Sequence, residues 1–337
     1  QYRTPTGKEI FYSTNHHQGG LMPSFTRAAT DNDKGGITMN FIMEFIMLKP
    51  WMLKWVSHFK DLQGFSYYQG WKSKGLCADA NHQPRIICKD VTVKKKTSSG
   101  TRNHVIHVIT TCEVVSNTPY SKLLDNRVLF TNTTHYRVFA NGKIEIECKY
   151  TPLSHLQGLK SLPRVGLNMV LQKPFYRVLY HGRGPHENYP DRKYSADMGV
   201  YRTTADQMHV VDYIVPSENG NRTDCRWMAF MDEDGEGVCV KSDGGDGGGG
   251  VPNFSAGLYS QADLDGAAHT CDLEERKDGD GEVYVNIDHE IMGVGGDCSW
   301  YPCVYPEYLV KATEPFIFRF SLLPVKKDEN PVLEARK

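Results

Sequence analysis

Residues 286–300 read Asn-Ile-Asp-His-Glu-Ile-Met-Gly-Val-Gly-Gly-Asp-Cys-Ser-Trp, a predicted strand that runs into a glycine-rich loop. Apolar and polar side chains alternate up to Asp288, as they do in a strand whose two faces differ. Three glycines within Gly293–Gly296 then break the strand, because glycine adopts backbone conformations that other residues avoid. The loop therefore brings Asp297 and Trp300 close together.

Two interpretations of this loop remain open from its residues alone. The face of an indole can stack on the C–H face of a sugar ring, while a carboxylate such as Asp297 binds the sugar hydroxyls. A glycine-rich turn that ends in Trp300 is also typical of a packed corner without any ligand.

The rest of the chain is predicted to consist mainly of strands. Runs rich in Val, Ile and Thr occur at Arg85–Thr97, His104–Ser116, Arg127–Phe139, Val165–Leu171, Phe175–Tyr180, His209–Val215 and Phe316–Leu323. Asn141-Gly142 predicts a hairpin turn between two of them. Helical patterns do not alternate with the strands, which argues against a parallel α/β sheet. One short helix is expected near residues 50–60, where Pro50 suits a first helical position.

Composition excludes several classes of protein. The chain has 337 residues and a formal net charge of −1, so it has no general attraction for nucleic acid. The most apolar run, Phe41–Leu53, is too short and too charged to span a bilayer, so no membrane span is expected. Residues 243–251 are glycine-rich and are expected to form a flexible surface loop. Asp232–Asp243 matches calcium-loop spacing, but its flanks are strand-like, which favours a hairpin.

Sequons and cysteines suggest a secreted glycoprotein. Asn132, Asn221 and Asn253 each begin an Asn-X-Ser/Thr sequon. The nine cysteines are an odd number, so at least one cannot pair within the chain, which predicts a homo-oligomer linked by a disulfide. Cys298 and Cys303 bracket Trp300; a disulfide between them and simple burial of both thiols are both open.

Four stretches resemble one known family in the same order along the chain. Residues 25–33 (Phe-Thr-Arg-Ala-Ala-Thr-Asp-Asn-Asp), 182–192 (Gly-Arg-Gly-Pro-His-Glu-Asn-Tyr-Pro-Asp-Arg), 215–220 (Val-Pro-Ser-Glu-Asn-Gly) and 286–300 resemble motifs in the last domain of glycoside hydrolase family 2 β-galactosidases. Ala29 stands where that family usually has proline, and Cys298 where it commonly has an acidic residue. The resemblance covers almost the whole chain.

The resemblance implies a fold and a division of labour. It implies one domain over residues 1–337, an antiparallel β-supersandwich similar to galactose mutarotases. In the family, the two catalytic carboxylates lie on a (β/α)₈ barrel, and this chain contains only the final domain. The resemblance therefore implies no catalytic residue, metal or cofactor in this chain. It also implies that Trp300 is the indole that stacks on substrate.

Three functions are consistent with these observations. We expect a free-standing, secreted lectin for galactose-containing glycans; the alternatives are the small subunit of a two-chain β-galactosidase with a barrel-bearing partner, or a mutarotase-like epimerase using His181, His186 or His289. The predicted sugar-binding residues are Arg27, Asp31, Asn32, His186, Glu187, Asn188, Glu218, Asn219, His289, Asp297 and Trp300. Arg27 could instead pair with a nearby aspartate, and Asn188 could only hold its turn.

Overall fold

The computed structural model describes residues 2–3, 9–17, 20–27, 38–42, 67–76, 84–97, 104–118, 121–171, 174–212, 218–243, 252–260, 263–264, 267–273, 281–296, 303–327 and 329–334. Side chains are described from Tyr67 onward, except those of Tyr68, Gln69, Thr97, His104, Leu333 and Glu334. Within these ranges no helix is long and apolar enough to cross a membrane.

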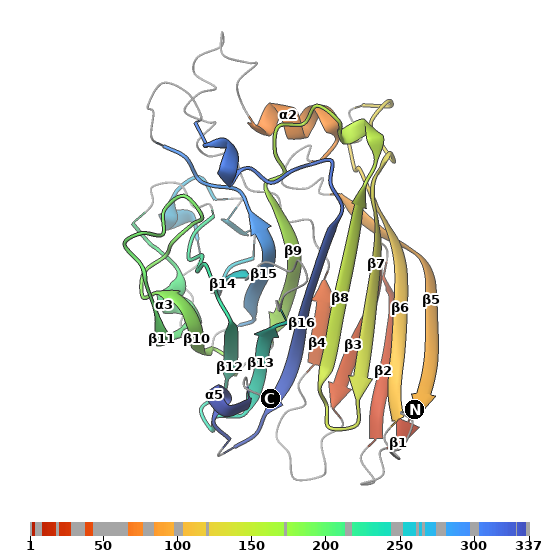
Figure 1. Ribbon diagram of the computed structural model, residues 1–337, viewed down its shortest axis with the longest axis vertical. Coiled ribbons are helices and arrows are strands. Elements are labelled where there is room, and N and C mark those ends of the chain that lie inside the picture. Colours follow the sequence, from red (N-terminus) through yellow and green to blue (C-terminus); the bar gives the residue numbers. More distant parts are fainter. Residues whose placement is uncertain are drawn as a thin grey trace.

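The described strands form two antiparallel sheets (Figure 1). The seven-stranded sheet has the order β1 (Tyr2–Arg3), β2 (Glu9–His17), β3 (Gly20–Arg27), β4 (Thr38–Ile42), β9 (Arg164–Leu171), β15 (Val283–Ile291) and β14 (Asn253–Gly257). The nine-stranded sheet has the order β11 (Asp197–Thr204), β10 (Arg177–Gly184), β12 (Trp227–Met231), β13 (Gly237–Ser242), β16 (Phe316–Val325), β8 (Ile144–Pro152), β7 (Val128–Phe139), β6 (His104–Val115) and β5 (Arg85–Thr97). The predicted all-β antiparallel sandwich is confirmed.

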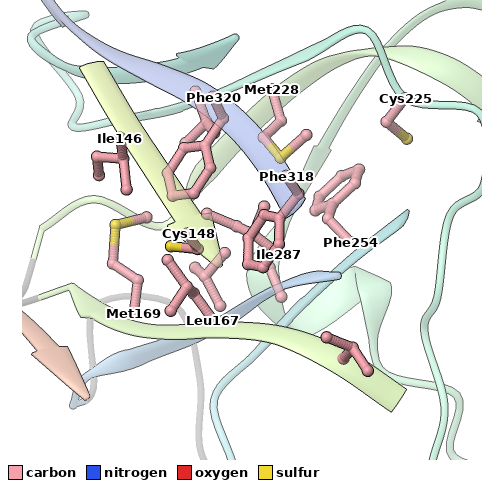
Figure 2. Packing of buried hydrophobic residues seen from close by; sticks show 14 of the residues in the cluster. Ile146, Cys148, Leu167, Met169, Cys225, Met228, Phe254, Ile287, Phe318 and Phe320 are labelled. Carbon is pink, nitrogen blue, oxygen red and sulfur yellow. The ribbon is translucent and has the colours of Figure 1, made fainter. Parts of the chain in front are cut away.

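The main core lies between the two sheets. In β8, buried and partly exposed side chains alternate over most of the strand, as the sequence pattern predicts for a strand with one buried face. Figure 2 shows the packing, to which the larger sheet contributes Ile146, Cys148, Met228, Phe318 and Phe320, and the smaller sheet Leu167, Met169, Phe254 and Ile287. Strand β15 is buried on both faces. The polar Asn286 on its second face can be buried because it forms side-chain hydrogen bonds with Asn168 and Ser255.

Helices are few and short in the described part of the chain. They are α2 (Tyr67–Lys74), which lies at one end of the sandwich, α3 (Ala205–Met208) and α5 (Pro331–Glu334) (Figure 1). The helix expected near residues 50–60 lies outside the described residues. Of the strand predicted at His209–Val215, the described part, His209–Asp212, is not a strand, because it leaves the end of α3.

Turns account for two further sequence features. Asn141-Gly142 forms the predicted turn between β7 and β8, with Gly142 at a φ of 88° that favours glycine. The calcium-like spacing at Asp232 falls in a hairpin between β12 and β13, closed by backbone hydrogen bonds between Asp232 and Glu236 and between Gly235 and Asp232. The glycine-rich loop lies outside the described residues except for Asp243.

The sequence-based prediction of a disulfide-containing glycoprotein is wrong. None of the seven described cysteines forms a disulfide, and they include Cys303, for which a disulfide with Cys298 was one of two open alternatives. The side chains of the three sequon residues are buried, with Asn132 and Asn221 at 0% exposure and Asn253 at 8%. A glycan cannot be accommodated on a buried amide, so the inference of secretion loses both observations on which it rested.

Candidate functional site

Three of the four motif segments meet at the end of β15, and Asn188 ties one of them, residues 182–192, to Thr223, just beyond residues 215–220. Its side-chain oxygen accepts hydrogen bonds from the backbone N–H and the hydroxyl of Thr223, at 2.9 and 2.6 Å. Its side-chain nitrogen donates to the carbonyls of Arg183 and His186 at 3.2 and 3.0 Å. Since Asn188 is 0% exposed, it holds these turns together and has no group left for a ligand.

Glu187 connects the segment 182–192 to the segment 215–220. Its Oε2 atom accepts a hydrogen bond from the backbone N–H of Gly220 at 2.9 Å and another from the hydroxyl of Tyr189 at 3.3 Å. Gly220 adopts a φ of 72°, and a Cβ atom there would lie 2.6 Å from the carbonyl oxygen of Met208. The turn at residue 220 therefore requires glycine.

A buried ionic cluster ties the second of these segments to β15. Arg164 donates to Asp288 through Nε at 3.0 Å and through a second, very short contact, and to Glu218 through Nη1 at 2.7 Å. Their side chains are 1%, 1% and 5% exposed. Gly166 makes room for this cluster, because a Cβ atom there would lie 2.4 Å from Oδ1 of Asp288.

The cluster holds one cation and two carboxyl groups, so it cannot be neutral with both ionised. Burial raises the pKa of Glu218 to about 7, against the opposing attraction of Arg164. Burial also raises the pKa of Asp288, but its two hydrogen bonds from the guanidinium favour its charged form. Of the two carboxyl groups, Glu218 is therefore the one that takes up a proton more readily. Its Oε1 atom has no partner among the described residues.

Asp191 fixes the glycine loop that leaves β15. Its carboxylate accepts hydrogen bonds from the backbone N–H groups of Val294 and Gly295, at 3.0 and 2.7 Å. Arg192 donates to the carbonyl of Gly295, and the N–H of Gly293 donates to the carbonyl of Tyr308 at 2.9 Å.

The glycines of this loop are required by geometry. Gly295 and Gly296 adopt φ values of 67° and 90°, as expected for a chain that leaves the strand. A Cβ atom at Gly293 would lie 2.6 Å from the Asp191 carboxylate. The loop is thus held from both sides directly before Asp297.

Several predicted site residues lie outside the described part of the chain: Asp31, Asn32, Asp297 and Trp300. Arg27 is the last residue of β3, and its side chain is not described. Their roles in binding a sugar therefore stay predictions.

The remaining predicted residues fall into two groups. Glu187, Asn188, Glu218 and Asn219 come together, and each is engaged within the protein; Oδ1 of Asn219 lies 3.1 Å from Nδ1 of His209. The exposed His186 lies beside them, with Nε2 3.0 Å from the Ser195 hydroxyl. His289 instead stacks on Phe318 at 5.5 Å between ring centroids.

Arg164 and Asp191 were not among the predicted site residues. Asp191 could have been found, since it lies inside the 182–192 motif and aspartate often accepts hydrogen bonds from turn N–H groups. Arg164 carries no local signal, because an arginine at the start of a strand is ordinarily exposed.

The family model and the sequence relatives agree on one family. The family model described as beta galactosidase small chain matches residues 2–322. A beta-galactosidase of Vibrio cholerae serotype O1 is 33% identical over 295 residues, which are 88% of this chain and 23% of the relative. A beta-galactosidase of Oenococcus oeni is 29% identical over 292 residues, 86% of this chain and 23% of the relative.

Among solved structures, an amine oxidase of Aspergillus nidulans aligns with 97% of this chain and 52% of its own, at 9% identity and a TM-score of 0.33. A likeness this distant supports no argument about function.

Proposed function

The chain belongs to the beta galactosidase small chain family, and from this membership we propose that it is the small-chain part of a β-galactosidase, active together with a barrel-bearing part of the enzyme. The observation that carries the proposal is the family match over residues 2–322 in a chain that spans 23% of relatives named beta-galactosidase. The expectation of a free-standing lectin is wrong, because these relatives are named beta-galactosidase.

The described residues support a binding role rather than hydrolysis by this chain alone. A retaining glycosidase needs two carboxyl groups about 5 Å apart that both reach the glycosidic bond. The carboxyl group of Glu218 is buried behind Arg164, and that of Glu187 is committed to the turn at Gly220. In the proposed enzyme the catalytic pair lies on the barrel, as the family resemblance implies.

The proposed contribution of this chain is the loop that follows β15. Asp191 binds the two successive N–H groups of Val294 and Gly295, so the described part of the loop is held directly before the residues that are predicted to bind sugar. A preset aromatic wall lowers the entropy lost when a sugar is positioned for reaction. Trp300 would stack on a galactose unit, and Asp297 would accept hydrogen bonds from its hydroxyls.

A mutarotase-like activity has no observation in its favour. It would require an acid and a base in one pocket. The described cavity that contains His289 includes neither His181 nor His186.

The proposal is tested by isolating the native chain from the cells that make it. We expect β-galactosidase activity to elute with this chain, together with barrel sequence identified by mass spectrometry on the same or an associated polypeptide. In that active material, Trp300→Ala should lower kcat/KM by about thirtyfold, as expected for loss of an aromatic anchor worth roughly 2 kcal/mol. Elution of the chain alone at its own mass of 38.1 kDa, without activity or barrel sequence, would refute the proposal.

A further inference from the structure

Two histidine side chains meet on the solvent-facing side of the larger sheet. His107 lies on β6 and His135 on β7, the two strands that follow the edge strand β5 (Figure 1). The register pairs His107 with Arg137 and His135 with Ile109, so the two histidines are diagonal neighbours. Diagonal neighbours on adjacent strands are within reach of aromatic and long side chains. Nδ1 of His107 and Nε2 of His135 accordingly lie 2.9 Å apart.

The spacing of these two nitrogens is that of two neighbouring ligands of one metal ion. Imidazole nitrogens bind divalent metals of the zinc type at ~2.0–2.1 Å. Two such bonds at a right angle place their nitrogens ~2.8–3.0 Å apart, and at a tetrahedral angle ~3.3–3.4 Å apart. The observed separation of 2.9 Å corresponds to the right angle. Right-angled coordination is typical of Ni(II) and Cu(II), whereas Zn(II) prefers a tetrahedron.

Both rings are neutral and partly exposed, as metal binding requires. Burial, followed by the charges of Lys96 and Arg137, lowers the pKa of His107. Burial and Arg137 lower the pKa of His135, against an opposing effect of Glu147. In the hydrogen bond between the rings, one facing nitrogen carries a hydrogen and donates it to the other. For both nitrogens to bind an ion, this hydrogen moves to the second nitrogen of its own ring, so no net proton is lost.

The positive side chains around the pair oppose a bound cation only weakly. Arg137, the cross-strand neighbour of His107, pairs with Glu145 at 2.9 Å, so its charge is largely compensated. Lys94 and Lys96 on the edge strand β5 are exposed, and solvent and salt screen their charges.

We propose that His107 and His135 chelate one divalent transition-metal ion, Ni(II) or Cu(II), which joins β6 to β7. Glu147, the β8 neighbour of His135, already pairs with Arg319 at 2.6 Å, and the described residues contain no group of three metal ligands. Water therefore fills the remaining positions of the ion. The two histidines are 28 residues apart in sequence, so the folded chain brings them together and the ion stabilises the fold.

The test is calorimetric titration of the full chain with Ni(II), which, unlike Cu(II), does not oxidise thiols. One equivalent should bind more tightly than the rest, and Mg(II), which prefers oxygen ligands, should not displace it. His107→Gln and His135→Gln should each weaken this equivalent at least about thirtyfold, because a single imidazole lacks the second, intramolecular bond. The matched control is His181→Gln, which changes a partly exposed histidine on β10 of the same sheet and should leave the affinity within about twofold.

Thermal unfolding gives an independent readout. Ni(II) should raise the Tm of the unmodified chain and of His181→Gln, but not that of His107→Gln or His135→Gln. Acidification should remove the increase, because protons compete with the ion for the same nitrogens. Hydrogen exchange with Ni(II) present should slow at residues 105–109 and 133–137.

The proposal fails if no equivalent of Ni(II) binds more tightly than the rest, if Mg(II) displaces it, or if Zn(II) binds more tightly than Ni(II). It also fails if His181→Gln weakens Ni(II) binding as much as His107→Gln and His135→Gln do. Lower stability of the last two variants without metal, together with unchanged Ni(II) binding, would show that the pair only joins the strands by its own hydrogen bond and would overturn the proposal. None of these readouts depends on galactosidase activity, so they leave the proposed function untouched.

Discussion

Replacing Arg164 with methionine should destabilise the fold far more than replacing a surface arginine. Arg164 is 1% exposed and forms the only cationic part of a cluster with Asp288 and Glu218 among the described residues. Methionine fills a similar volume, so the main effect is electrostatic. Removing one partner of a buried ion pair leaves an uncompensated charge and costs roughly 3–5 kcal/mol.

The matched control is Arg319→Met. Arg319 pairs with Glu147 at 2.6 Å, a contact as close as those of Arg164, but the two side chains are 39% and 41% exposed. Solvent screens such a pair, and its loss should cost about 0–1 kcal/mol. Because the two contacts are equally close, the difference in the free energy of unfolding between the two variants measures the effect of burial.

The free energy of unfolding is measured by urea titration at several pH values. Without Arg164, the pKa values of Asp288 and Glu218 should rise further in the folded state. A group whose pKa is raised on folding stabilises most below its unfolded pKa and loses that contribution as the pH rises. The deficit of Arg164→Met should thus be smaller at pH ~4.5 than at pH ~8. Equal losses in the two arginine variants, or a deficit that shrinks toward alkaline pH, would refute this reasoning.

Three further predictions concern single contacts. Glu218→Gln should flatten the fall in stability between pH ~4.5 and 7, because the raised pKa of Glu218, about 7, makes its contribution decline through that window; urea titrations that fall equally in both proteins would contradict this. Asp191→Ala should speed hydrogen exchange at Val294 and Gly295 roughly thirtyfold, for about 2 kcal/mol of lost charge-assisted hydrogen bonding, whereas the exposed Asp212→Ala should not. Gly237→Ala should cost at least about 1–3 kcal/mol, since its Cβ atom would lie 1.9 Å from the carbonyl oxygen of Phe230, while Gly257→Ala, with no atom within 4 Å, should be tolerated in thermal unfolding.

Much of the fold could be predicted because strands leave a local pattern. The predicted bounds of β5 agree with the structure, and the Asn141-Gly142 turn was identified from two residues. The region of His209 was predicted as a strand because its residues suit one. There the α3 helix and the hydrogen bond from the Asn219 side chain to the carbonyl of Val210 hold the backbone instead, and neither is visible in the local pattern.

The candidate site was predicted less completely, for a physical reason. Motifs indicate that residues matter together, but they do not distinguish a side chain that faces a ligand from one that holds a loop. Asn188 was predicted to bind sugar, yet all of its side-chain hydrogen bonds go to neighbouring turns. Arg164 was missed because its partner Asp288 is 124 residues away in the sequence.

The buried groups of this site act as a frame for the loop rather than as reacting groups. Arg164 fixes the position of Asp288 on β15, Asn188 and Glu187 fix the turns that pack beside it, and Asp191 fixes the loop that leaves the strand. Each of these contacts joins segments distant in sequence, so the direction of the loop is set by the sandwich as a whole. A backbone held in this way up to Gly296 loses little further entropy when the loop takes part in binding. That arrangement suits a part of an enzyme that supplies one wall of a binding site while another part supplies the carboxylates.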